Sequence, residues 1–204
     1  MALRTTVKVG NISNLSDARY CAGMGVQYLG FALDSTHKDY VDQDTLKTIK
    51  EWIVGPVIVG EFSESNRTLI EDSIIHNDID CIEITNPDIL KESPMFNLPV
   101  ILKIDISSFQ NLEQLQNIMD YNKDKIVFFL LDKSADSLIQ DEDIRNLAAH
   151  FKIMKGYSID KEQVNSWITG TDIFGIALKG GREIKPGFKE YDELAEILEA
   201  IEVE

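Results

Sequence analysis

The stretch VKVGNISNLSDARYCAGMGVQYLGF at residues 7–31 decides the fold class, because it joins an apolar run, a helix-period segment and a second apolar run. Asn14 can cap the helix through its side-chain oxygen, with Asp17 reaching back from the third helical position. Gly23 and Gly25 then end the helix. A strand, a helix and a second strand in this order predict the start of a parallel βα repeat.

The same alternation continues along the chain, which is typical of repeated βα units. We expect strands at residues 6–10, 28–33, 56–62, 81–84, 98–106, 125–132, 151–157 and 172–178. Helix-period segments lie between or after them, at 14–24, 43–53, 66–77, 109–121, 141–151, 160–168 and 191–201. The connection after 81–84 leaves room for a short helix at most before Pro94.

This pattern predicts the architecture of the whole chain. Eight strands alternating with helices in 204 residues fit a single (β/α)8 TIM barrel domain spanning residues 1–204. Closure of a barrel must pair the first strand, 6–10, with the last, 172–178. An open doubly wound sheet is the alternative, and the lack of a glycine-rich phosphate fingerprint after the first strand weakens it.

The net charge restricts the partners of the chain. With 35 acidic and 20 basic residues the net charge is -15, so we expect neither nucleic acid nor an acidic membrane as a partner. A small anionic ligand can still bind in a local pocket. No run approaches the roughly 20 apolar residues that span a bilayer, and the first ten residues lack the apolar core of a signal peptide. We expect a cytoplasmic protein, as a monomer or a homodimer.

The cysteines and histidines predict no metal site, and nothing in the sequence predicts a cofactor. Cys21 falls in a helical pattern and Cys81 in a strand pattern, so both are expected to be reduced core residues. The histidines lack the spacing of metal ligands; they are His37, His76 and His150.

Segments at both ends of the chain match one family pattern. Near the N-terminus the matching positions of K-I-C-G-I-T-N-x-x-D-A are Lys8, Ile12, Asn14, Asp17 and Ala18, followed by Gly30, Phe31, Tyr40 and Val41. Near the C-terminus, in GGREIKPGFKEYDEL, they are Gly181, Glu183, Pro186, Gly187 and Lys189. Through these residues the chain resembles the phosphoribosylanthranilate isomerases of tryptophan biosynthesis.

The resemblance implies an Amadori-type aldose–ketose isomerisation of a phosphorylated substrate, with a general base and a general acid on opposite sides. The family's aspartic acid after the sixth strand corresponds to Asp132. Its cysteine base corresponds to Gly10, which has no side chain to accept a proton. Its carboxylate-binding arginine corresponds to Asp39, which repels a carboxylate. His37 and Lys38 are neighbouring groups that could compensate for the arginine.

Barrels of this kind hold phosphate with backbone amides of the loops after strands seven and eight. Lys155 and Gly156 follow the seventh predicted strand core, and Lys179, Gly180 and Gly181 follow the eighth. We expect these residues to bind the phosphate group of a ligand. A plain turn at the two glycines is the alternative.

Two further carboxylates near strand ends, Glu83 and Asp105, are candidate substrate-binding residues. Each is either a replacement acid or base, or a hydrated group without a role in binding. Asp132 has the same two interpretations, as a general acid or as a solvated or capping carboxylate.

These features leave three hypotheses for function. The chain is an isomerase with a repositioned base or changed substrate, a barrel that binds a phosphorylated ligand without catalysing the rearrangement, or a different sugar-phosphate enzyme. Loss of both base and anchor argues against ordinary isomerase activity, because general base catalysis alone contributes about 10²–10⁴-fold. We expect Gly10→Cys with Asp39→Arg to raise activity more than either change alone.

Overall fold

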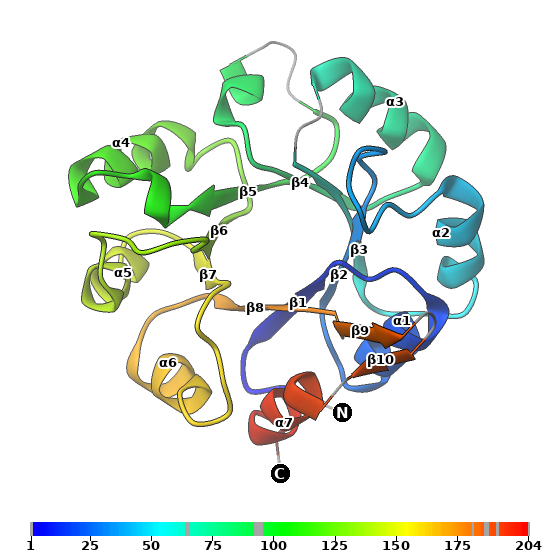
Figure 1. The fold of residues 1–204 in the computed structure, drawn as a ribbon. Coiled ribbons are helices and arrows are strands. Elements are labelled where there is room, and N and C mark those ends of the chain that lie inside the picture. Colours follow the sequence, from blue (N-terminus) through cyan, green and yellow to red (C-terminus); the bar gives the residue numbers. More distant parts are fainter. Residues whose placement is uncertain are drawn as a thin grey trace.

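The computed structural model describes residues 2–63, 66–91, 96–180, 182–185, 188–190 and 192–203. Eight parallel strands close into a barrel in the order of the sequence (Figure 1). They are β1 (Thr6–Gly10), β2 (Tyr28–Ala32), β3 (Val57–Phe62), β4 (Cys81–Ile84), β5 (Val100–Asp105), β6 (Phe128–Asp132), β7 (Ile153–Lys155) and β8 (Gly175–Lys179). The predicted (β/α)8 barrel is confirmed, and the open sheet is wrong, because β1 pairs with β8 from Thr6↔Gly175 to Gly10↔Lys179.

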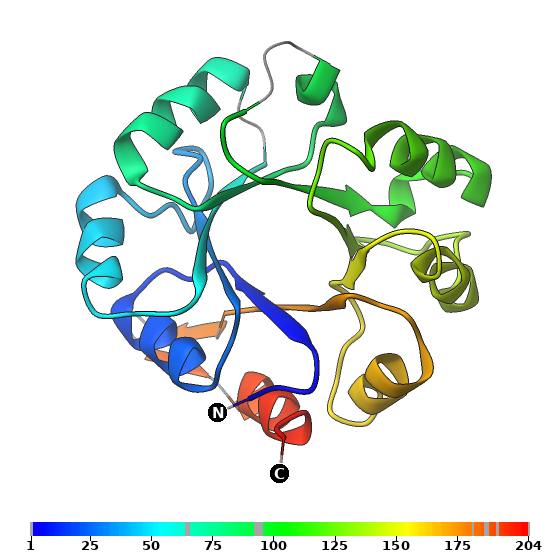
Figure 2. The same ribbon diagram turned by 180° about the vertical axis from the view of Figure 1, so that it is seen from behind.

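The helices surround the barrel on its outside, as the view from behind also shows (Figure 2). They are α1 (Leu15–Gly23), α2 (Gln43–Lys50), α3 (Arg67–Asn77), α4 (Leu112–Asn122), α5 (Asp141–Ala148), α6 (Val164–Gly170) and α7 (Asp192–Ala200). After β4 the described residues form a short 3-10 helix, η1 (Pro87–Lys91), in agreement with the prediction, and a second, η2 (Ile106–Ser108), follows β5. A hairpin that the sequence did not predict, β9 (Arg182–Lys185) and β10 (Phe188–Glu190), precedes α7.

Side-chain caps begin several of the helices where the sequence places an Asn or Asp. The Asn14 side chain accepts a hydrogen bond of 2.9 Å from the Asp17 amide at the start of α1, which confirms the predicted cap. Asp42, Asn66 and Asn111 cap α2, α3 and α4 in the same way. Because each cap satisfies an amide that the helix leaves unpaired, it fixes where the helix begins beside its strand.

The apolar core has two parts. The larger part fills the space between the strands and the helices, and includes Cys21 of α1 at the outside of the barrel. The smaller part fills the barrel interior and includes Cys81, Phe128 and Met154. An aromatic floor formed by Tyr28, Phe128 and Phe174 lies at the amino-terminal end of the barrel, with ring centroids 5.4 Å and 5.2 Å apart.

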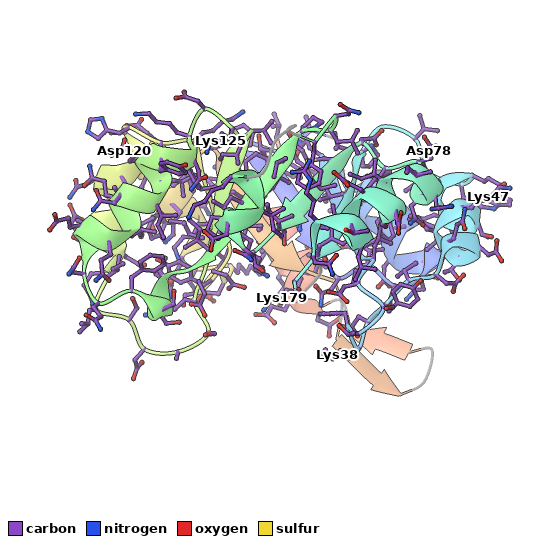
Figure 3. All side chains as sticks on the ribbon, turned by 90° about the horizontal axis from the view of Figure 1, so that it is seen from above. Lys38, Lys47, Asp78, Asp120, Lys125 and Lys179 are labelled. Carbon is purple, nitrogen blue, oxygen red and sulfur yellow. The ribbon has the colours of Figure 1, made fainter. Side chains whose placement is uncertain are left out.

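The opposite end of the barrel, at the carboxyl ends of the strands, carries the polar side chains. Figure 3 shows Lys38 and Lys179 on this face together with the β9–β10 hairpin, whereas Asp78, Asp120 and Lys125 lie on the other face. Ligand sites of TIM barrels lie at the carboxyl ends of the strands. None of the helices within the described ranges has the length and apolarity needed to cross a bilayer.

Candidate functional site

The end of β1 has no reactive side chain, and a carboxylate from β3 fills the space beside it. A Cβ built on Gly10 would lie 2.6 Å from Oε1 of Glu61 and 3.2 Å from Nζ of Lys8. A Cβ on Gly30 of β2 would also overlap Glu61 Oε1. The Glu61 carboxylate therefore occupies the volume that side chains at positions 10 and 30 would need, so a larger residue at either position would have to displace it.

Lys8 holds this carboxylate in place from inside the barrel. Its ammonium group forms a hydrogen-bonded ion pair with Glu61 and lies 2.9 Å from Oε2 of Glu83. The Asn11 amide donates a 3.1 Å hydrogen bond to the other oxygen of Glu61. Lys8, Glu61 and Glu83 are 2%, 8% and 4% exposed, so this trio is sealed from water. Glu83 was predicted to bind substrate, but its carboxylate is buried against Lys8 and would have to leave this ion pair to contact a ligand.

Electrostatics keep Lys8 and Glu61 ionised. Burial opposes the charge on Lys8, but Glu61 and Glu83 outweigh it and raise the pKa of Lys8 above its ordinary value. Burial likewise opposes ionisation of Glu61, but the Lys8 ammonium outweighs it and lowers the pKa of Glu61. A base needs a pKa near the working pH to take up a proton efficiently. A carboxylate whose pKa is lowered in this way is a weak proton acceptor.

Cys81 cannot replace the missing thiol. It lies below Glu83 on β4, within the apolar barrel interior. Burial, with a contribution from Glu83, raises the pKa of the Cys81 thiol to about 12. The thiolate form is therefore disfavoured at neutral pH.

Asp132, the predicted general acid, ends β6 at the barrel mouth. Its Oδ2 lies 3.3 Å from Nζ of Lys103, and its Oδ1 accepts a 2.9 Å hydrogen bond from the Lys133 amide. Burial opposes the charge on Lys103, but Glu83, Asp132 and Glu61 raise the pKa of Lys103. Lys103 and Asp132 remain partly open to solvent, with side chains 31% and 18% exposed.

The loop after β2 places Asp39 beside β1. Nδ2 of Asn11 donates a 3.1 Å hydrogen bond to Oδ2 of Asp39, and the Asp39 amide donates one of 3.2 Å to Nδ1 of His37. Lys38 is 83% exposed in its side chain and lies 3.9 Å from the same carboxylate. Asn11 adopts a left-handed backbone with φ 57°, which asparagine tolerates better than most residues. This loop presents a carboxylate in the place of the expected arginine.

Asp105 joins two loops. Its Oδ1 accepts hydrogen bonds from the amides of Ser107, at 2.9 Å, and Ser134, at 3.2 Å, and both serine hydroxyls donate to its carboxylate. Although partial burial opposes ionisation, these hydrogen bonds lower the pKa of Asp105. The carboxylate therefore ties the loop after β6 to the end of β5.

A cavity with a volume of about 670 Å³ opens at the ends of β6, β7 and β8. Asp132, Lys133, Gly156, Lys179 and Gly180 line it together with the first turns of α7. A second cavity of about 430 Å³ at the ends of β4 and β5 also contains Asp132, together with Lys103 and Asp105. Asp132 thus borders both cavities.

The backbone amides of the two glycines are already used. The Gly156 amide donates to Leu131 O at 2.8 Å, and the Gly180 amide donates to Gly10 O at 2.8 Å. Gly181 lies outside the described residues. Three exposed carboxylates of α7, from Asp192, Glu193 and Glu196, also line the cavity. The cavity therefore combines two lysines with an acidic rim.

The structure does not bring Lys155 to this cavity. Its side chain is fully buried outside the barrel wall, and Nζ donates a 2.5 Å hydrogen bond to Tyr157 O. Because residues alternate sides along a strand, Met154 faces the barrel interior and Lys155 faces the helices. The sequence prediction that Lys155 adds charge beside the phosphate group did not take this alternation into account.

Sequence reasoning missed Glu61 and Lys103 as site residues and treated Lys8 only as a family match. All three are charged residues inside otherwise apolar strands. The alternation of side chains along two of these strands is the signal that could have found them, because Glu61 and Lys103 fall on the same sides of their strands as Val59 and Ile101, which face the barrel interior. The described residues contain no group of three or more His, Cys, Asp or Glu arranged to hold a metal ion.

Comparisons with known proteins agree on the fold. No protein-family model and no curated protein matches the sequence. A phosphoribosylanthranilate isomerase structure from Thermotoga maritima aligns with a TM-score of 0.79 at 20% identity, covering 97% of this chain and 98% of that one. One in complex with reduced 1-(o-carboxyphenylamino)-1-deoxyribulose 5-phosphate gives 0.77 at 19%, with the same coverage. The enzyme from Thermus thermophilus gives 0.74 at 18%, covering 96% and 98%. The chain therefore has the fold of the phosphoribosylanthranilate isomerases.

Proposed function

We propose that this chain is a divergent relative of the phosphoribosylanthranilate isomerases that binds a phosphorylated sugar-type ligand without catalysing their rearrangement. The observation that carries the proposal is the Glu61 carboxylate beside Gly10. It fills the position of a base, is paired with Lys8, and is itself a weak proton acceptor. The proton transfers of an aldose–ketose rearrangement need both a base and an acid, and of the described counterparts of the family's acid and base Asp132 alone has a side chain that can transfer a proton.

The second loss concerns recognition of an aryl carboxylate. Asp39 stands where the family's arginine would be and is held by Asn11. A carboxylate approaching Asp39 would be repelled, and the exposed Lys38 ammonium offsets little of that repulsion in water. The preferred ligand would then lack a benzoate group.

The cavity at β7 and β8 supports binding of a phosphate group. Lys133 and Lys179 line it, as do Tyr157 and Ile159, and Ser158 between these two residues has a left-handed φ of 46°. A left-handed residue next to ordinary ones makes successive amides converge, which creates a concave site for an anion. We expect the amides of Tyr157 and Ser158 to be the donors, because those of Gly156 and Gly180 bond to neighbouring strands.

Two measurements test this proposal. Turnover of phosphoribosylanthranilate, followed by the fluorescence of its anthranilate group, should be absent or far below the usual enzyme range of roughly 1–10³ s⁻¹. Calorimetric titration should show binding of ribose 5-phosphate but not of ribose. Lys179→Gln should weaken the binding of ribose 5-phosphate. Lys125→Gln, on the opposite face, is the matched control. Ordinary turnover that survives Asp132→Asn would overturn the proposal, as would equal affinity for ribose and its phosphate.

A different reaction on a sugar phosphate is the second candidate. The Lys103–Asp132 pair is open to solvent and borders both cavities, so these two groups could contact a bound ligand. A screen of sugar phosphates for turnover that disappears in both Asp132→Asn and Lys103→Met would favour this function over ligand binding alone.

A further inference from the structure

Lys155 is a buried ammonium group that the proposed ligand site does not use directly. It is fully buried, and its Nζ lies 3.5 Å from the centroid of the Tyr157 ring and 4.6 Å from that of Trp167 in α6. Its hydrogen bond to Tyr157 O measures 2.5 Å, and Asp141 of α5 lies 3.9 Å away. The side chain therefore touches the turn after β7 and is packed against the two helices that flank it.

This turn forms a wall of the large cavity. Gly156 and Tyr157 line the cavity, and Ser158 has the left-handed φ of 46°. A Cβ on Gly156 would lie 2.9 Å from Leu130 Cδ2 and 3.1 Å from Leu131 O, so the turn is pressed against β6. On its other side the Tyr157 hydroxyl donates a 3.0 Å hydrogen bond to Asp141. The turn is thus held at two points: Lys155 bonds to the Tyr157 carbonyl, and Asp141, which also lies near Lys155, bonds to the Tyr157 hydroxyl.

The charges around Lys155 decide how it titrates. Burial lowers the pKa of Lys155 to about 8, Lys133 and Arg145 act in the same direction, and Asp141 and Asp160 oppose them. Arg145 of α5 stacks over Trp167 at 4.2 Å, and Lys133 of the β6 loop lies 6.0 Å from the Tyr157 ring. The Tyr157 hydroxyl stays protonated, because burial and Asp141 raise its pKa.

We propose that Lys155 is a positioning residue whose ammonium group holds the Tyr157 carbonyl, and with it the 156–158 turn, in the conformation that binds the phosphate group. This inference rests on the proposed function and adds a regulation to it. A charge-assisted hydrogen bond is about twice as strong as a neutral one, so loss of the proton loosens the turn. By reciprocal linkage, ligand binding at a pH near the midpoint takes up a proton.

The first experiment measures ribose 5-phosphate affinity by calorimetry from pH 7.0 to 9.5, in buffers of different ionisation enthalpy. The wild type should lose roughly 5-fold or more of its affinity over this range and take up protons near pH 8. Lys155→Met should show weaker binding, a flat profile and no proton uptake. Lys152→Met, an exposed position just before β7, should behave as the wild type.

A ligand-free measurement separates the two proposals. The amide resonances of Gly156, Tyr157 and Ser158 should shift with a midpoint near pH 8 in the wild type but not in Lys155→Met. Asp141→Asn should move that midpoint down, because it removes a charge that favours the ammonium form. If these resonances titrate but ribose 5-phosphate does not bind, the proposed function fails, whereas control of the 156–158 turn by protonation of Lys155 is supported.

The opposite pattern overturns the inference. Binding with the same pH profile in the wild type and Lys155→Met would leave the proposed function intact and exclude Lys155 as its positioning residue. Amide resonances of the 156–158 turn that show no midpoint near pH 8 in the wild type, or the same midpoint in Lys155→Met, would also exclude Lys155 as the positioning residue. Failure of both the binding and the titration would exclude both proposals.

Discussion

The two halves of the barrel mouth differ in what fills them. On the side of β1 to β4, Lys8, Glu61 and Glu83 pair with one another and are almost completely buried. On the side of β6 to β8, a cavity of about 670 Å³ remains open above Gly156 and Lys179. The filled half contains Gly10, the position to which the sequence resemblance assigns the base, and the open half is where barrels of this kind hold phosphate.

This contrast teaches that one half of a barrel mouth can be packed with charged side chains while the other half stays open. Glycine at position 10 and a carboxylate on β3 together give an internal ion pair in the first half. The strands themselves keep their closed order. Substitutions in the filled half should mainly change the stability of the fold, and substitutions in the open half should mainly change ligand affinity. The two effects can be measured separately.

The largest effect is expected from breaking the filled half. Glu61→Val leaves Lys8 with Glu83 as its remaining carboxylate, and removing one partner of a buried ion pair costs about 3–5 kcal/mol. Urea unfolding at pH 7 measures this loss. Asp120→Asn, which breaks an exposed pair with Lys123, is the control and should cost at most a few tenths of a kcal/mol.

The same variant has a pH signature. Because the folded-state pKa of Glu61 is lowered, its contribution is present above its unfolded value of about 4.3 and is lost as the pH falls through the folded value. The stability gap between the wild type and Glu61→Val should therefore narrow in acid. A gap that stays constant from pH 7 to pH 3 would contradict an ionised Glu61.

A smaller effect should come from restoring a side chain at position 10. Gly10→Cys alone is expected to destabilise by about 1–3 kcal/mol, because its Cβ meets the Glu61 carboxylate at 2.6 Å. In a Glu61→Val background the cost should fall, with a coupling energy of about 0.5–3 kcal/mol in the double-mutant cycle. Rescue of isomerase activity by Gly10→Cys with Asp39→Arg, predicted from the sequence, therefore requires Glu61→Val as a third change.

Asp105, at the end of β5, lies between the two halves and accepts hydrogen bonds from Ser107 and Ser134. Asp105→Asn keeps an acceptor for Ser107 and Ser134 but loses its charge, so we expect a cost of about 1 kcal/mol. Because Ser134 follows Lys133, affinity for ribose 5-phosphate should also fall. Asp120→Asn, in an exposed pair with Lys123, should change neither quantity appreciably. Unchanged stability and affinity in Asp105→Asn would show that the halves are not joined there.

The smallest effect concerns the acidic rim of the open half. Asp192→Asn with Glu193→Gln removes two exposed carboxylates from the cavity, which should raise affinity for ribose 5-phosphate by about 2- to 5-fold. The gain should shrink as salt is added, because exposed charges are screened. Glu199→Gln, near the far end of α7, is the control. A loss of affinity in the double variant would mean that these two carboxylates do not repel the bound phosphate group.

The sequence predicted the fold well because each strand and helix carries its own local signal. Apolar runs marked all eight strands, Asn14 marked the start of α1, and closure required the pairing of 6–10 with 172–178. The β9–β10 hairpin was missed because it lies in a polar, glycine-containing segment without such a run.

The site was predicted only in part, because it depends on register between strands. The empty position at Gly10 is visible in the sequence, but its occupation by Glu61 follows from how β1, β2 and β3 are staggered in the barrel. Lys155 shows the same limit, since a single step along β7 turned its side chain from the mouth to the helices.

The aromatic floor of Tyr28, Phe128 and Phe174 gives the buried Lys8 a distinctive kinetic property. With the rings packed below it and carboxylates around it, its ammonium protons have no short path to bulk water. Their exchange with solvent should be slow enough for the Lys8 Nζ–H signal to be observed by NMR at neutral pH, unlike those of exposed lysines. That lifetime would report directly on how often the barrel opens.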